Sequence, residues 1–123
     1  MVIRWFSEPN KIPKNVITSI QDPGNDVFLS TASSWEVQIK IGTGKISFLE
    51  LWELNVRREI EKNSLVVLSV LLEHTFALGK LPLIHRDPFV KIPLAQALSE
   101  ELTLVTNDSF IRNYPDIKTL WEV

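Results

Sequence analysis

The chain has 123 residues, of which 45% are hydrophobic and 23% charged, and its formal net charge is −2. This size predicts one domain over residues 1–123, and the absence of cysteine excludes disulfides, thiolate metal ligands and a cysteine nucleophile. No apolar run approaches the ~20 residues of a membrane span, and charged residues interrupt any signal peptide, so we expect a cytoplasmic protein. The net charge gives no sign of a basic, nucleic-acid-binding face, although an acidic metal site would mask part of one.

The first half of the chain predicts helices around one strand. Residues 16–20 suit a short helix that ends at the turn sequence Asp22-Pro23-Gly24-Asn25. Residues 27–30 have the apolar character of a buried strand. Apolar residues alternate from 35 to 41, as in a strand, but serines before them and glycines after them favour a helix. Residues 48–62 show the clearest amphipathic helical pattern.

The second half alternates strands and helices. The expected elements are a buried strand at residues 65–68, a helix at 71–78 closed by Gly79, a helix between Pro88 and Leu102, and strands at 103–106 and 117–121. Pro93 inside a helix would cost ~3 kcal/mol, so the helix around it should begin near Pro93 or kink there. The alternation predicts an α/β fold with three layers, α/β/α, and a mostly parallel sheet.

Acids that follow or flank the apolar elements form the candidate site. Asp108 follows a strand-like run that ends in Thr106 and Asn107, and Glu36 and Asp87 lie near other element ends. Ligands of open α/β sheets bind outside the carboxyl ends of the strands. Because Mg²⁺ and Mn²⁺ prefer oxygen ligands, carboxylates that arrive from several segments indicate a hard-metal site. Thr106 would either hydrogen-bond locally or position a water.

Each acid also has a structural alternative. Ser33-x-x-Glu36 is a capping-box pattern, in which the glutamate returns to the backbone of the cap. Asp87 precedes a proline, as a helix cap commonly does, and Asp108 suits a cap for a short helix at 109–113. Capping and metal binding do not exclude one another.

Other chemistries have little support in the sequence. His74 and His85 lack the paired spacing of a zinc site, and no Gly-x-Ser-x-Gly elbow is present. The Gly42-Thr43-Gly44-Lys45 segment lacks the length of a phosphate loop and indicates a helix end. The four tryptophans are expected in the core or an interface.

Several blocks occur in a characteristic order. They are Val27-Phe28-Leu29-Ser30, Ser34-Trp35-Glu36-Val37, Leu81-Pro82, His85-Arg86-Asp87-Pro88-Phe89, Ala95-Gln96-Ala97, Leu102-Thr103-Leu104-Val105-Thr106 with Asp108, Tyr114-Pro115 and Leu120-Trp121. Together they resemble the PIN domain of VapC-type toxins from bacterial toxin–antitoxin pairs, over essentially the whole chain. That family consists of metal-dependent ribonucleases with acids at the carboxyl edge of a parallel sheet.

The resemblance implies which acids bind metal. Glu36 matches the second acid of the family and Asp108 the fourth. The resemblance therefore implies Mg²⁺ or Mn²⁺ held by Glu36 and Asp108, with Asp87 as a further ligand and Thr106 in support. Such ions would activate a water for attack on a phosphodiester.

Two departures from the family pattern bear on activity. Residues 2–8 resemble the helix that follows the first strand of the family, so we expect that strand and its metal-binding aspartate to be absent. Val90 stands where the family has a later aspartate, and Asp87 would substitute for it only in part. A central strand that is missing predicts a gap or a rearranged order in the sheet, with residues 2–6 as a candidate filler.

The expected function is a metal-dependent endoribonuclease, the toxin of a toxin–antitoxin pair, with impaired activity in this chain. The expected partners are RNA, a cognate antitoxin and a second copy of the chain in a homodimer, with no membrane contact. An alternative is a catalytically degenerate PIN homologue that acts only as an antitoxin- or protein-binding module. A weaker alternative is an unrelated doubly wound domain with an acidic Mg²⁺ pocket.

Overall fold

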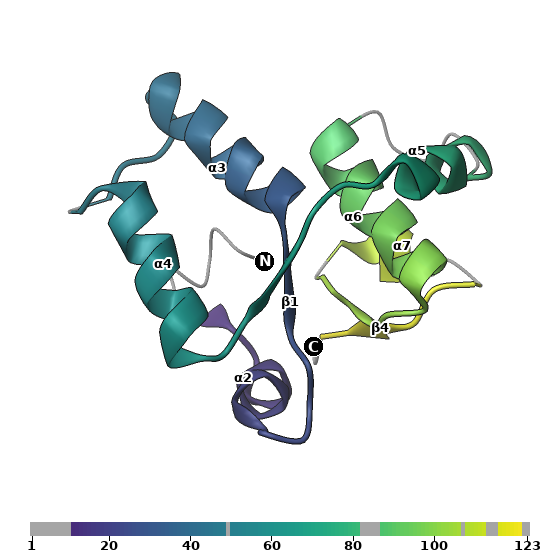
Figure 1. Cartoon of the computed structure of the whole chain (residues 1–123), viewed down its shortest axis with the longest axis horizontal. Helices are drawn as coiled ribbons and strands as arrows, with labels where there is room; N and C mark the ends of the chain where they lie inside the picture. Colours follow the sequence, from purple (N-terminus) through teal and green to yellow (C-terminus); the bar gives the residue numbers. More distant parts are fainter. Residues whose placement is uncertain (1–10, 49, 82–86, 107, 113–115, 122–123) are drawn as a thin grey trace.

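The computed structural model describes residues 11–48, 50–81, 87–106, 108–112 and 116–121 (Figure 1). Short parallel strands and longer helices alternate along these residues, so the predicted α/β class is confirmed. The predictions for residues 2–6 and for His85 concern residues outside the part of the chain that the structure describes.

The strands form two separate parallel pairs. β1 (Phe28–Ser30) pairs with β2 (Val66–Leu68), and β3 (Leu104–Val105) pairs with β4 (Thr119–Leu120). Among the described residues no hydrogen-bonded ladder joins the two pairs into one sheet. Within the described residues the two pairs are not joined, which agrees with the predicted gap or rearranged order in the sheet.

The helices surround these pairs. They are α2 (Lys14–Gln21), α3 (Thr31–Gly42), α4 (Trp52–Lys62), α5 (Leu72–Gly79), α6 (Pro88–Glu100) and α7 (Ser109–Arg112). In Figure 1, α3 and α4 lie together on one side of β1, and α5, α6 and α7 lie together on the other. Most predicted helices are confirmed, although several begin at other residues than expected.

The start of α3 corrects the predicted capping box. Ser30 ends β1, and its Oγ accepts the N–H of Ala32 at 3.2 Å, so the helix begins at Thr31. Ser33 is consequently an interior residue of the helix, and the interpretation of Ser33 with Glu36 as a capping box is wrong. A cap on the last residue of the strand makes the turn from β1 into α3 immediate.

The start of α4 is later than predicted. Leu51 is the extended residue before the helix, with ψ at 136°, and Trp52 is the first helical residue. The Trp52 side chain is buried, its ring stacks on Phe48 with centroids 5.6 Å apart, and its Nε1 donates to Ser34 Oγ at 3.1 Å. This indole therefore joins α4 to α3, which confirms the expected core role for Trp52.

Helix α6 begins before Pro93, so the expectation that the helix starts near Pro93 is wrong. The helix begins at Pro88, with Asp87 as its cap, and it continues through Pro93 to Glu100. A proline at the first helical position costs nothing in hydrogen bonding, whereas Pro93 removes the bond to Phe89. The buried face of the helix, which includes Leu94 and Ala97, offsets that loss through packing.

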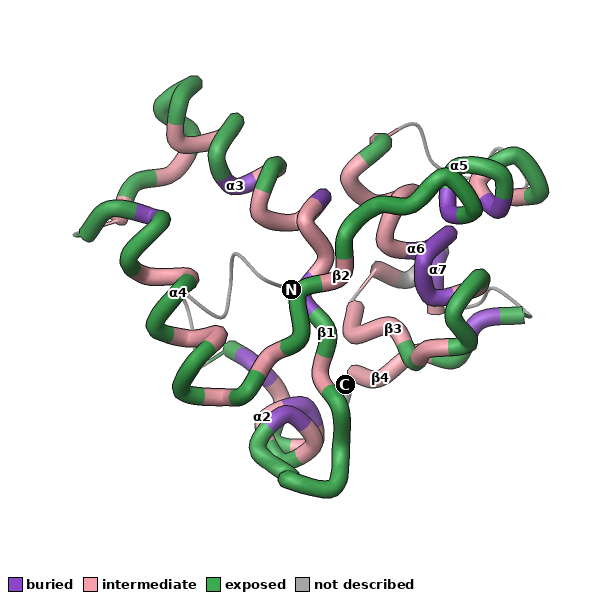
Figure 2. Tube along the Cα trace, viewed as in Figure 1, coloured by how far each residue is buried: buried purple, intermediate pink, exposed green. Residues whose placement is uncertain are grey.

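Two buried clusters show how the layers are stacked (Figure 2). The first contains Ile12, Val16 and Ile20, with Ile17, Val27, Val105, Leu120 and Trp121 against it. The second contains Leu94, Ile111 and Ile117, with Leu81, Val90, Leu98 and Leu104 against it. Neighbouring residues of a strand point to opposite faces, so Val105 faces α2 and Leu104 faces α6. The β3–β4 pair is thus a middle layer between α2 and α6, as the three-layer prediction requires.

The β1–β2 pair is less buried than expected. Leu29 is buried, but Phe28 is 39% exposed, Val66 45% and Val67 50%. The prediction of a fully buried strand at residues 65–68 is therefore wrong. Among the described strands, β2 pairs only with β1, so an apolar sequence alone did not determine its burial.

Candidate active site

Two of the sequence blocks described above, one on α3 and one on α6, are in contact near the starts of these helices. The ring of Trp35 on α3 packs edge-on against Phe89 on α6, with centroids 5.3 Å apart and planes at 87°. Trp35 remains 59% exposed, so the pair lies at the surface. The contact between Trp35 and Phe89 therefore brings the segment that contains Glu36 close to the segment that contains Asp87.

Glu36 lies in α3, and its side chain is only 22% exposed. One carboxylate oxygen forms an ion pair with Lys40 Nζ at 3.2 Å, one helical turn later. This pairing supplies a local role in place of the rejected capping box. The ion pair engages one carboxylate oxygen, so this pairing alone does not decide whether Glu36 binds a metal ion.

Asp87 caps α6, as the structural alternative proposed. Its Oδ1 accepts the N–H of Phe89 at 2.9 Å, and the residue is half-buried. A capping carboxylate still has a second oxygen, so this geometry alone does not decide its metal-binding role.

Asp108 lies between β3 and α7. Its Oδ1 accepts the N–H of Ile111 at 3.4 Å, and its own N–H donates to Thr106 Oγ1 at 3.1 Å. Both the capping role of Asp108 and the local hydrogen bond of Thr106 are confirmed. The carboxylate is thereby fixed next to the carboxyl end of β3, where a ligand of an α/β sheet would bind.

Val90 has an apolar environment. Its side chain is half-buried and packs against the cluster of Leu94, Ile111 and Ile117. The valine contributes to the packing of α6 on α7.

The carboxylates of this region are the type of ligand that a hard cation prefers, but they are few. Within the described residues, no three His, Cys, Asp or Glu side chains gather closely enough to hold a metal ion. The assignment of Glu36, Asp87 and Asp108 as metal ligands stays a prediction. Carboxylate oxygens are the right type of ligand for Mg²⁺ or Mn²⁺.

The sequence analysis did not predict a polar network that connects β1, α5 and α6. Ser30 Oγ donates to Gln96 Oε1 at 2.5 Å, and Gln96 Nε2 lies 3.5 Å from His74 Nδ1. His74 Nε2 lies 2.8 Å from Glu100 Oε1, and Leu71 N–H donates to Nδ1 at 2.9 Å. Gln96 and His74 are each 1% exposed. The only sequence signal was a glutamine flanked by alanines in a helix with little polar character.

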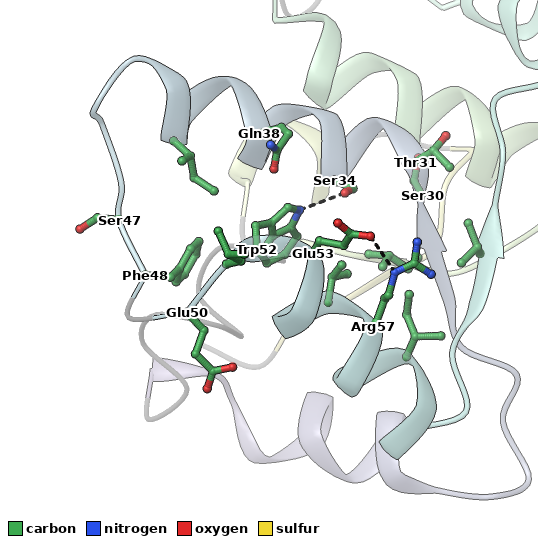
Figure 3. A pocket seen from close by; sticks show the side chains of 16 residues that line it. Ser30, Thr31, Ser34, Gln38, Ser47, Phe48, Glu50, Trp52, Glu53 and Arg57 are labelled. Atoms are coloured by element: carbon green, nitrogen blue, oxygen red, sulfur yellow. Dashed lines mark hydrogen bonds and ion pairs between the residues drawn. The ribbon is translucent and has the colours of Figure 1, made fainter.

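A cavity of about 890 Å³ opens between α3 and α4 (Figure 3). Its apolar lining includes Leu29, Ile41, Phe48, Trp52, Val56 and Val67. Polar side chains also line it, among them the ion-paired Glu53 and Arg57, whose charged atoms are 3.3 Å apart. The cavity is therefore suited to an apolar segment with polar flanks.

The two arginines of α4 pair with acids. Glu50 raises the pKa of Arg58, first through a side-chain hydrogen bond and second through its charge. Arg57 forms an ion pair with Glu53.

Comparison with known proteins shows what fold the chain has but does not show its activity. No protein-family model matches the sequence, and no curated protein does. The chain is similar in structure to one in the crystal structure of VapBC2 from Rickettsia felis bound to a DNA fragment from their promoter. The TM-score is 0.70 at 16% sequence identity, over 98% of this chain and 92% of that chain. The chain therefore shares the α/β fold of a component of a toxin–antitoxin complex.

In the part of the chain that the structure describes, no helix combines the length and apolar character of a membrane span.

Proposed function

We propose that the chain is the toxin component of a toxin–antitoxin pair and acts on RNA as a Mg²⁺- or Mn²⁺-dependent endoribonuclease. The observation that carries this proposal is the fold, which matches a VapBC2 chain over 98% of this chain. The position of Asp108, directly beyond the carboxyl end of β3, supports the same conclusion. Activity is expected to be low, because Val90 stands where the family has an aspartate.

Three carboxylates and one threonine of the chain would hold the metal ion. Asp108 and Glu36 would be the main carboxylate ligands, Asp87 a third, and Thr106 would hold Asp108 in place through its hydrogen bond. When bound, the ion would lower the pKa of a water and offset charge on the phosphodiester. Because misplacement by ~1 Å can cost ~100-fold in rate, loss of one orienting carboxylate is enough to explain weak activity.

The ribonuclease proposal is tested by cleavage of a long single-stranded RNA in Mg²⁺ or Mn²⁺. We expect slow cleavage that chelation stops and that Asp108→Asn and Glu36→Gln abolish. Lys62→Gln on α4 is the matched control and should keep the wild-type rate. Cleavage that survives both chelation and Asp108→Asn would contradict the proposal. Absence of any cleavage in either metal would instead favour the binding-module alternative.

An antitoxin is the proposed occupant of the cavity between α3 and α4. The VapBC2 structure is a complex, and the apolar lining of this cavity suits an apolar segment of a partner. Co-expression with the protein encoded beside this chain should give a stable complex that Val56→Arg disrupts. Leu54→Arg is the control, because Leu54 is 58% exposed and does not line the cavity. Equal loss of binding in both variants would contradict this location.

A further inference from the structure

The ring of His74 caps the start of α5. Leu71 is the extended residue before this helix, and His74 is its third helical residue. The N–H of Leu71 donates to Nδ1 of His74 at 2.9 Å. In a capping box, a glutamate or glutamine at this third position accepts the same N–H. The imidazole of His74 therefore replaces the side-chain oxygen of that motif.

The ring is buried, and its second nitrogen is bonded as well. His74 is 1% exposed, and its Nε2 lies 2.8 Å from Oε1 of Glu100 on α6. Because a backbone N–H can only donate, Nδ1 is the acceptor and Nε2 carries the proton of the neutral ring. Among the described charged side chains, Glu100 is the one that bonds to the ring, whereas Glu73 and Glu101 are exposed. The ring thus accepts one hydrogen bond and donates the other.

Protonation of His74 would affect these two hydrogen bonds in opposite directions. An imidazolium carries a proton on both nitrogens and has no acceptor. Its Nδ1–H would point at the N–H of Leu71, so the capping bond could not form. Its Nε2–H would still donate to Glu100, now with the attraction of opposite charges. Mild acid would therefore release Leu71 while the ring stays attached to α6.

Gln96 offers no alternative partner for the added proton. Its Nε2 lies 3.5 Å from Nδ1 of His74, and an amide nitrogen is itself a donor. Its Oε1 already accepts the hydroxyl of Ser30. The added proton would consequently meet donors from both Leu71 and Gln96, and the part of the contact that can move is the first turn of α5.

We propose that His74 is a pH-sensitive cap, which holds the first turn of α5 at neutral pH and releases it in mild acid. Histidine changes charge between about pH 5 and 8, whereas the glutamate of an ordinary capping box stays charged down to about pH 4. The turn carries the exposed side chains of Leu71 and Leu72, so its release would change an apolar surface of the molecule. The inference rests on the hydrogen bonds of α5 and not on the proposed ribonuclease activity, so either can fail without the other.

The test is NMR spectroscopy of the full chain, labelled with ¹⁵N, in a titration from about pH 8 to about pH 5. The ring nitrogens of His74 report its protonation, and a coupling between the nitrogen of Leu71 and Nδ1 reports the capping bond. We expect this coupling to disappear, and the Leu71 amide proton to shift, in step with protonation of the ring. The Nε2–H proton should remain protected from exchange with water. The N–H of Thr43, which bonds to the carbonyl of Ile39 at the end of α3, is the internal control and should not change.

A matched variant separates the imidazole from other effects of acid. His74→Gln keeps an acceptor for the N–H of Leu71 that does not titrate, so its Leu71 amide should show no transition over the same pH range. If this variant does not fold, the titration of the wild-type chain decides by itself.

Four results would overturn the proposal. The first is protonation of His74 without a change at Leu71, and the second is a ring that stays neutral at about pH 5 in the folded chain. The third is simultaneous loss of the Thr43 signal, because acid would then unfold the whole chain and not one turn. The fourth is the same Leu71 transition in the His74→Gln variant.

Discussion

The hydroxyl of Ser30 donates to the amide oxygen of Gln96, 66 positions later in the chain. The same hydroxyl accepts the N–H of Ala32 and caps α3. The amide nitrogen of Gln96 lies 3.4 Å from the carbonyl oxygen of Ser69, beyond the end of β2. One buried glutamine therefore connects the carboxyl ends of β1 and β2 to α6, next to the candidate site.

Replacement of Gln96 by leucine should destabilise the fold by about 1–3 kcal/mol, because the buried amide and the half-buried hydroxyl of Ser30 would lose their hydrogen bond. Urea denaturation measures the loss. Gln38→Leu on α3 is the control, since Gln38 is exposed and should change stability by less than about 0.5 kcal/mol. Equal effects of the two substitutions would show that the Gln96 network contributes nothing.

The contacts of His74 fix its tautomer. Leu71 N–H can only donate, so Nδ1 of His74 is the acceptor and Nε2 carries the proton toward Glu100. Nitrogen NMR of the imidazole should show the Nε2–H form, whereas an Nδ1–H signal would contradict the arrangement. His74→Ala should cost about 2–4 kcal/mol, because it leaves a cavity and an unpaired N–H. Glu100→Gln keeps an acceptor and should cost much less.

Val90 gives a test of the metal site that does not depend on catalysis. Val90→Asp should lower stability by about 1–3 kcal/mol without metal, because a carboxylate would replace a side chain packed on Leu94 and Ile111. Mn²⁺ should restore part of that loss if Asp108 shares the ion. Val90→Asn is near-isosteric with the aspartate and uncharged, so Mn²⁺ should not rescue it. Thermal unfolding with and without Mn²⁺ measures both, and equal rescue would count against a metal at this position.

Exposed apolar side chains on α5 provide a candidate face for the homodimer that the sequence analysis predicts. Leu72 is 65% exposed and Phe76 61%, and they lie one helical turn apart on the same face. Light scattering at micromolar concentration should give a dimer for the chain and a monomer for the double variant Leu72→Ser, Phe76→Ser. Leu54→Ser on α4 is the control and should remain dimeric. A monomeric wild-type chain would exclude the dimer.

Features that depend on neighbouring residues were predictable from the sequence. The turn after α2 forms because Asp22 accepts the N–H of Gly24 at 2.8 Å, within the predicted turn sequence. Asp87 and Asp108 act as caps because a side-chain oxygen two or three positions away can reach the free N–H groups of the first turn. The alternation of strands and helices followed from the same local patterns, and with it the α/β class.

Features that depend on distant partners required the tertiary structure. The start of α3 at Thr31 depends on Ser30, whose hydroxyl is held by Gln96 from another helix. The exposure of Val66 and Val67 depends on which strands pair with β2, not on their own apolar character. The division of the strands into two pairs has the same origin, because hydrogen bonds across a sheet join segments that no local sequence pattern specifies. Local chemistry therefore determined which elements form, and long-range pairing and packing determined where they begin, what they bury and which strands pair.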